Sequence, residues 1–210
     1  MNVLSAGLRR RTWSSLAALL LVAATAHATT VVPPEFDQLV NETDYVVRAV
    51  VKSVKSEYRN GPDGRTIVSF VELEVRETIL GTPPAHVVLE MLGGQIGDHE
   101  LEVVGAPKFK TGDEDILFVS GNGRTISPLF AMMHGRYPVL REPGTGRRYI
   151  ARSNLEPLAA TADVARPIEP ASVTSPQPLA AGTAAALTPE QFAAQIKAAV
   201  NPNYLRARLH

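Results

Sequence analysis

Between residues 44 and 152 the chain alternates between apolar and polar positions in short runs. Over residues 44–54, Tyr45, Val47, Ala49 and Val51 share one face, while Arg48 and other polar residues fall on the opposite face. A period of two predicts a half-buried β-strand. Similar apolar runs predict further strands at residues 66–80, 86–92, 100–104, 116–119, 124–129, 137–141 and 148–152.

Turn residues separate these runs. The cluster at residues 60–64 reads Asn-Gly-Pro-Asp-Gly, and residues 81–84 read Gly-Thr-Pro-Pro. Asn122-Gly123 is a strong hairpin signal and predicts that residues 116–119 pair with residues 124–129. Many short antiparallel strands with glycine-rich turns favour a small barrel or sandwich. We therefore expect a mainly β fold with a small closed OB-type barrel over residues 29–152.

The pattern changes after residue 152. Residues 153–187 are rich in Ala, Pro, Thr and Ser without periodicity, which predicts a disordered linker. A helix is expected over residues 188–201, because Thr188, Pro189 and Gln191 form a capping-box start. Its apolar residues fall at Phe192, Ile196 and Val200. So short a helix must dock on its own barrel or on a partner, and residues 202–210 form a tail.

The first 28 residues have the organisation of a signal peptide. Arg9, Arg10 and Arg11 precede an apolar run at residues 16–24, and Ala26 and Ala28 flank His27 at the expected cleavage site. The apolar run is shorter than the roughly 20 residues that span a bilayer. We expect cleavage after Ala28, a secreted or periplasmic protein, and no stable membrane span in the mature chain.

Charge and cysteine content exclude several function classes. The chain has 21 basic and 21 acidic residues, and loss of the three signal-peptide arginines leaves 18 against 21. This balance indicates no nucleic-acid partner. The chain has no cysteine, which excludes disulfides, thiol catalysis and cysteine-ligated zinc.

Catalytic motifs are absent from the sequence pattern. Asp98-His99-Glu100 cannot converge on one face of a strand, and the acidic residues 113–115 lack the spacing of a calcium loop. We interpret His134, beside Gly135, as a satisfied structural histidine at a bulge. We expect no enzyme, no cofactor and no metal of the protein's own.

The expected mature N-terminus resembles the tissue inhibitors of metalloproteinases. Residues 29–34 read Thr-Thr-Val-Val-Pro-Pro, and residues 43–49 read Thr-Asp-Tyr-Val-Val-Arg-Ala. They are similar, at the same spacing, to the family's opening Cys-Thr-Cys-Val-Pro-Pro and its Ser-Asp-Leu-Val-Ile-Arg-Ala. Residues 71–75 with Leu80-Gly81, and residues 116–119 with the turn at 121–123, resemble the family's later strands. The resemblance implies a netrin-like (NTR) OB-type barrel.

The resemblance also implies a specific mode of binding. The free α-amine and carbonyl of the first residue, here Thr29, would chelate the zinc of a metalloprotease. The side chain of Thr30 would enter the specificity pocket, and Val31, Val32 and Pro33 would form a strand-like wedge. The family's two N-terminal cysteines, which tether the wedge by disulfides, are Thr29 and Val31 here.

A second resemblance covers most of the mature chain. Residues 104–109 (Val-Gly-Ala-Pro-Lys-Phe), 111–114 (Thr-Gly-Asp-Glu) and 116–119, with the Phe192 and Ile196 helix, are similar to uncharacterised exported bacterial proteins. Together the patterns predict an exported, non-enzymatic binding protein, with an exported zinc metalloprotease as partner. The alternative is a structural or interaction protein of the cell envelope that binds through the barrel surface and the C-terminal helix.

Overall fold

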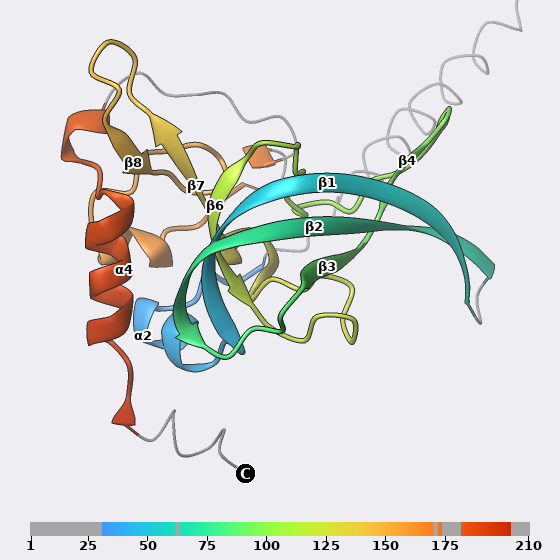
Figure 1. The fold of residues 1–210 in the computed structure, drawn as a ribbon, viewed down its shortest axis with the longest axis horizontal. Coiled ribbons are helices and arrows are strands. Elements are labelled where there is room, and N and C mark those ends of the chain that lie inside the picture. Colours follow the sequence, from blue (N-terminus) through green and yellow to red (C-terminus); the bar gives the residue numbers. More distant parts are fainter. Residues whose placement is uncertain (1–30, 62–63, 170–171, 174–181, 203–210) are drawn as a thin grey trace, which may run out of the picture. The chain divides into compact units, whose positions relative to one another are not determined.

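A six-stranded antiparallel sheet forms the centre of the computed structural model, which describes residues 31–61, 64–169, 172–173 and 182–202 (Figure 1). The sheet order is β3-β2-β1-β6-β7-β8. Its strands are β1 (Tyr45–Gly61), β2 (Gly64–Gly81), β3 (Val87–Leu92), β6 (Glu114–Val119), β7 (Arg136–Arg141) and β8 (Arg148–Ile150). A separate hairpin joins β4 (Gly94–Ile96) to β5 (His99–Leu101). The expectation of a mainly β fold is confirmed.

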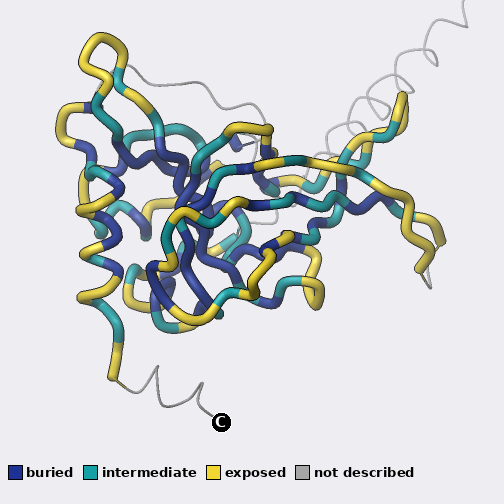
Figure 2. Tube along the Cα trace, viewed as in Figure 1, coloured by how far each residue is buried: buried dark blue, intermediate teal, exposed yellow. Residues whose placement is uncertain are grey.

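The central strands of the sheet are buried, as the dark blue tube in Figure 2 shows, and apolar side chains form a core on each face of the sheet. Tyr45, Val47, Ala49 and Val51 lie in one core with residues of β2 and β3, as their alternation predicted. Val46 points the other way, into a second core that contains residues of both α-helices. The start of β1 is therefore buried on both faces, whereas its distal half is largely exposed.

The closed barrel is not seen. β3 and β8 are the two ends of the sheet order, and no strand pairing joins them in the part of the chain that the structure describes. The edge of β3 is covered by a loop instead. Asn122 accepts a hydrogen bond from Glu90 N (2.9 Å) and donates one to Val88 O (2.7 Å), and Ile126 O accepts from Leu92 N (3.0 Å).

This use of Asn122 corrects the predicted hairpin at Asn122-Gly123. Residues 124–129 form no strand, and only a single bridge links Val119 to Leu129. The turn closes through Arg124 N and Thr125 N, which both donate to Gly121 O, while the Asn122 side chain bonds to the edge of β3. The strands that pair with β6 are β1 and β7.

The helix expected over residues 188–201 is present as α4 (Pro189–Ala198). Thr188 Oγ1 accepts from Gln191 N (3.2 Å), and Gln191 Oε1 accepts from Thr188 N (2.9 Å), so the predicted capping box is confirmed. A second helix, α2 (Phe36–Asn41), was not predicted. It lies beside α4 (Figure 1), and Asn41 Nδ2 donates to Ala199 O at 3.1 Å.

The described part of residues 153–187 is packed, so the prediction of a disordered linker is wrong for these residues. Leu158 and Val164 are fully buried in the helix-side core, and Ile168 and Val173 are buried elsewhere. The backbone continues the sheet edge, since Leu187 O accepts from Ile150 N at 2.8 Å. A few well-spaced apolar residues are enough to pack this segment against the folded domain, even though the sequence has no periodicity. Residues 153–187 also contain short 3₁₀ turns at Thr161–Ala165 and Thr183–Ala185.

Candidate functional site

The N-terminal segment of the described chain is the first candidate site. Thr29 and Thr30 lie outside the described residues, as do the expected signal peptide and its cleavage residues Ala26 and Ala28. Val31 is half-buried, Val32 is 80% exposed, Pro33 is half-buried and Pro34 is buried. The exposed Val32 therefore lies between two anchored positions.

The anchor for Val31 is a small apolar cluster. Its side chain packs against Met133, Ile168 and Val173, all buried. Met133 belongs to a 3₁₀ turn, Met132–Gly135, which is held by Ser153 Oγ donating to Met133 O at 2.5 Å. Sequence reasoning missed this cluster, because Ile168 and Val173 are isolated apolar residues in a segment without periodicity.

The 3₁₀ turn carries backbone strain. Ala131 and Met132 both have positive φ, 48° and 53°. Such conformations cost on the order of 1 kcal/mol or more in a non-glycine residue. Packing of Met133 against Val31 and its neighbours contributes to offsetting this cost.

His134, in the same turn, is buried but not satisfied. It is 2% exposed, and its Nε2 has no hydrogen-bond partner among the described residues. Burial and then the nearby Arg152 guanidinium lower the pKa of His134 to about 4. The interpretation as a satisfied histidine was wrong for this atom, and the ring is neutral at physiological pH.

The acidic run at residues 113–115 is separated by strand alternation. Asp115 is fully buried and paired with Arg136 (2.8 Å), and Asp113 lies 2.9 Å from the same guanidinium. Glu114 points to the opposite face of the sheet, 3.3 Å from both Arg48 and Arg148. No group of three or more His, Asp or Glu side chains in the described ranges is placed to hold a metal ion.

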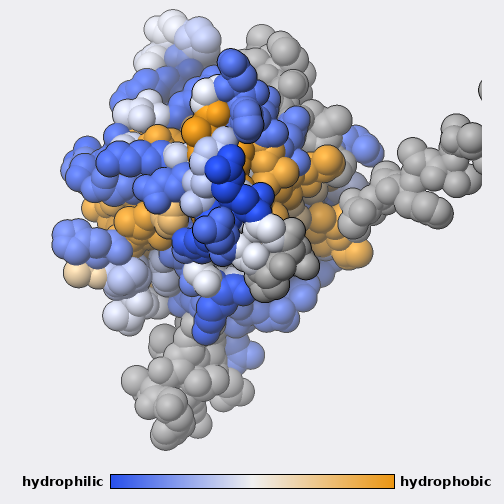
Figure 3. Space-filling model, turned by 90° about the vertical axis from the view of Figure 1, so that its right-hand side faces the viewer, coloured by the Kyte–Doolittle hydropathy of each residue, from blue (hydrophilic) through white to orange (hydrophobic). Residues whose placement is uncertain are grey.

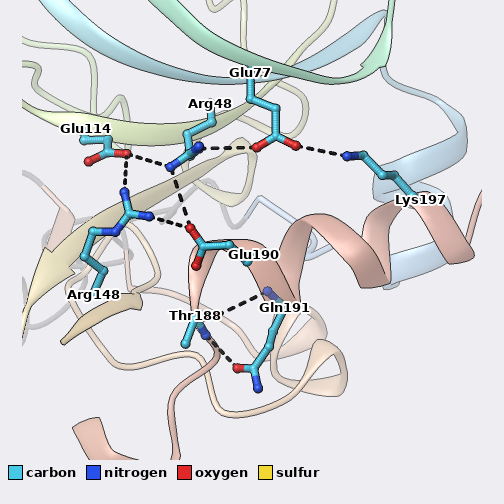
Figure 4. Close-up of polar contacts among 8 residues, drawn as sticks. All are labelled: Arg48, Glu77, Glu114, Arg148, Thr188, Glu190, Gln191 and Lys197. Carbon is cyan, nitrogen blue, oxygen red and sulfur yellow. Dashed lines mark hydrogen bonds and ion pairs between the residues drawn. The ribbon is translucent and has the colours of Figure 1, made fainter.

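An ionic cluster joins α4 to the sheet (Figure 4). Glu77 lies 3.4 Å from Arg48 Nε and 2.9 Å from Lys197 Nζ, so it links β1 and β2 to the end of α4. Arg148 contacts both Glu114 of the sheet and Glu190 of α4. The helix predicted to dock is thus docked on its own sheet.

A cavity of about 390 Å³ lies between the sheet and the segment that follows β5. Val54, Val71 and Met91 contribute apolar lining. Its two serines are hydrogen-bonded to each other and to the backbone. Ser69 Oγ donates to Gly93 O (2.7 Å) and lies 3.0 Å from Ser56 Oγ. Among the described residues, neither serine has a hydrogen bond to a histidine, lysine or carboxylate side chain. Glu100, Glu102 and Lys108 also line the cavity, so its lining is of mixed polarity.

One residue of the acidic trio around His99, Glu100, lines this cavity. The trio Asp98-His99-Glu100 forms the turn and start of β5, and the His99 ring contacts Tyr58 edge-on at 6.3 Å. Glu100 lies 3.3 Å from Lys108 Nζ. His99 and Glu100 are thus engaged in separate surface contacts.

Comparison with known proteins adds no assignment: no protein-family model and no curated protein matches the chain. No helix in the described ranges combines the length and apolar composition that a bilayer crossing requires.

Proposed function

We propose that the protein is an exported, non-enzymatic binding protein that engages a zinc metalloprotease through its mature N-terminus. The observation that supports it best is the placement of Val32. It is 80% exposed while the side chains of Val31 and Pro34 on either side are held by the folded unit. A short segment of this kind can enter a cleft without first losing much conformational freedom.

The chemistry follows from a chain that starts at Thr29. A neutral α-amine, whose pKa is ordinarily near 8, can bind zinc together with the carbonyl of the same residue. The Thr30 side chain would enter the pocket next to the zinc. Val32 and Pro33 would lie along the cleft, and the fixed φ of Pro33 would keep the segment extended.

Apolar packing takes the place of the missing disulfides in this proposal. Val31 stands where the resemblance places a tethering cysteine, and its side chain packs on Met133, Ile168 and Val173. We further propose that the sheet is an opened OB-type, netrin-like barrel. The long β1 pairs with both β2 and β6, and register shifts interrupt its pairing with β2, as expected of a strand that bends around a small barrel.

The alternative is an envelope protein that binds a partner through the barrel surface and the helix. The part of this alternative that relies on an apolar helix face is weakened. The apolar stripe of α4 is used within the chain, since Phe192 and Ile196 are fully buried. A partner of α4 would have to bind its exposed polar face.

The test compares two forms of the protein: one begins at Thr29, and the other carries one extra N-terminal alanine. Both are assayed against a panel of zinc endopeptidases, with unfolding curves to show equal stability. Inhibition by the first form alone is the expected result. Equal inhibition by both forms, or by neither, would overturn zinc chelation by Thr29. N-terminal sequencing of the exported protein checks the cleavage site independently.

A further inference from the structure

The distal half of β1 is an open strand edge. β1 pairs with β6 only over residues 45–50, and the loop at Gly112 and Asp113 then closes the edge at Val51 with two hydrogen bonds (2.9 and 2.8 Å). From Ser53 to Gly61 the strand pairs with β2 alone. Within the described ranges, no backbone hydrogen bond reaches the other edge of these nine residues.

This edge differs from the outer edges of β3 and β8. Asn122 and Ile126 cover the edge of β3, and Leu187 and Leu158 cover that of β8. In Figure 1 the β1–β2 ribbon extends well past β6. A long uncovered edge presents a row of free N–H and C=O groups to another strand.

The side chains along this edge are self-complementary about Ser56. Lys55 and Glu57 carry opposite charges on one face, and neither takes part in an ion pair with the described residues. Val54 and Tyr58, on the other face, are 38% and 39% exposed. Figure 3 looks onto this end of the molecule and shows apolar surface on both sides of a hydrophilic centre.

We propose that two copies of this chain pair antiparallel through residues 53–59 of β1, about a two-fold axis at Ser56. Lys55 of one copy then faces Glu57 of the other, and Val54 faces Tyr58, each twice by symmetry. The result is a continuous sheet that crosses from one copy to the other.

The charge pattern selects this register. A two-fold axis at Glu57 places like charges opposite each other, Glu57 on Glu57 and Lys55 on Arg59. An axis at Lys55 places Lys55 on itself. An axis at Tyr58 sets Glu57 against Arg59, but Arg59 is already engaged by Glu90. Only the axis at Ser56 pairs both free charges.

A charge-swap series tests the proposal in the exported chain. Sedimentation velocity at low salt, from about 1 to 100 µM, should show a dimer for the unmodified protein. Lys55→Glu and Glu57→Lys alone should each weaken the dimer at least tenfold, because each places two pairs of like charges in contact. The double variant K55E/E57K should restore it, because the pairs are again opposite.

Several outcomes would overturn the proposal. They are a monomer at every concentration, single variants that dimerise like the unmodified protein, or a double variant that stays monomeric while its circular dichroism is unchanged. The third outcome separates charge pairing from a merely damaged strand.

Cysteine cross-linking tests the register, because the chain has no cysteine of its own. Val54→Cys and Tyr58→Cys are prepared separately and oxidised alone or mixed. The mixture should cross-link, because residues 54 and 58 face each other across the axis. Each variant alone places its two thiols about 13 Å apart, four residues at about 3.3 Å each, beyond the reach of a disulfide. Cross-linking of either variant alone at the rate of the mixture would refute this register.

Discussion

Arg136 donates two hydrogen bonds to the fully buried carboxylate of Asp115, from Nε to Oδ1 at 2.8 Å and from Nη2 to Oδ2 at 3.2 Å. The same guanidinium donates to Lys108 O at 2.7 Å and stacks over the Phe109 ring at 4.4 Å. Burial raises the pKa of Asp115, and the charge of Arg136 opposes that shift. The pair therefore fastens β6 and β7 to the segment that precedes them.

Asp115→Asn is expected to lower the free energy of unfolding by about 3–5 kcal/mol, because it removes the fully buried counter-charge of Arg136 and leaves only the partly exposed Asp113. Asp113→Asn is the matched control. Asp113 contacts the same Arg136 but is about a third exposed, so its loss should cost about 1 kcal/mol or less. Urea denaturation followed by circular dichroism measures both. A cost for D115N no larger than that for D113N would show that the buried pair does not matter in this way.

The strand pattern predicted most of the sheet because alternation directly reports which positions are buried. Tyr45, Val47, Ala49 and Val51 share one core as expected, and the capping box at Thr188 and Gln191 begins α4 at the predicted residue. Local rules failed where tertiary contacts decide. Asn122 serves a neighbouring strand instead of a tight hairpin, and Leu158 and Val164 are docked by contacts distant in sequence.

The candidate site was less predictable. Residues 29–33 were singled out by resemblance, but the exposure of Val32 depends on the anchoring of Val31 by Met133, Ile168 and Val173. These three residues are widely separated from Val31 along the chain. No local pattern indicates that they meet, so only the folded arrangement could identify the anchor.

His134 is expected to make the protein sensitive to mild acid. Its pKa is lowered from 6.5 to about 4 in the folded protein, so the unfolded chain binds a proton more readily between these values. The contribution of His134 to the free energy of unfolding is therefore greatest above about pH 6.5 and is lost as the pH falls towards 4. At pH 4.5 the loss from this residue should be about 2.5 kcal/mol, at 1.36 kcal/mol per pKa unit.

His134→Leu provides the comparison, since leucine has no group to protonate. The difference in unfolding free energy between pH 7 and pH 4.5, from urea curves, should be smaller in the variant by about that amount. If H134L loses as much stability in acid as the unmodified protein, other groups cause the loss.

Phe192 is the main apolar anchor of α4. Its ring lies 5.0 Å from that of Tyr137, 6.0 Å from Phe36 and 6.2 Å from Phe118, measured between centroids. Phe192→Ala should lower the free energy of unfolding by about 3–5 kcal/mol through the cavity it leaves. Lys197→Ala, at an exposed position of the same helix, should cost less than about 1 kcal/mol. Similar costs for the two variants in urea unfolding would argue against a helix fixed on its own sheet.

Gly94 sets the position of the β4–β5 hairpin over the sheet. Its φ is +133°, and a Cβ at this residue would overlap the side-chain oxygens of both Ser56 and Ser69. Gly97, in the turn of the same hairpin, also has a positive φ, +58°, but a Cβ there meets open space. Gly97 therefore reports the cost of a positive φ without steric overlap, whereas Gly94 combines a positive φ with overlap.

Gly97→Ala should cost about 1 kcal/mol of unfolding free energy from the left-handed conformation alone. Gly94→Ala should cost at least about 2 kcal/mol, because the serine side chains must also move and the Ser56–Ser69 hydrogen bond is disturbed. Amide hydrogen exchange should show faster exchange over β4 and β5 in G94A and little change in G97A. Equal costs and equal exchange in the two variants would mean that the hairpin is not held against these serines, and that the cavity beneath it is open.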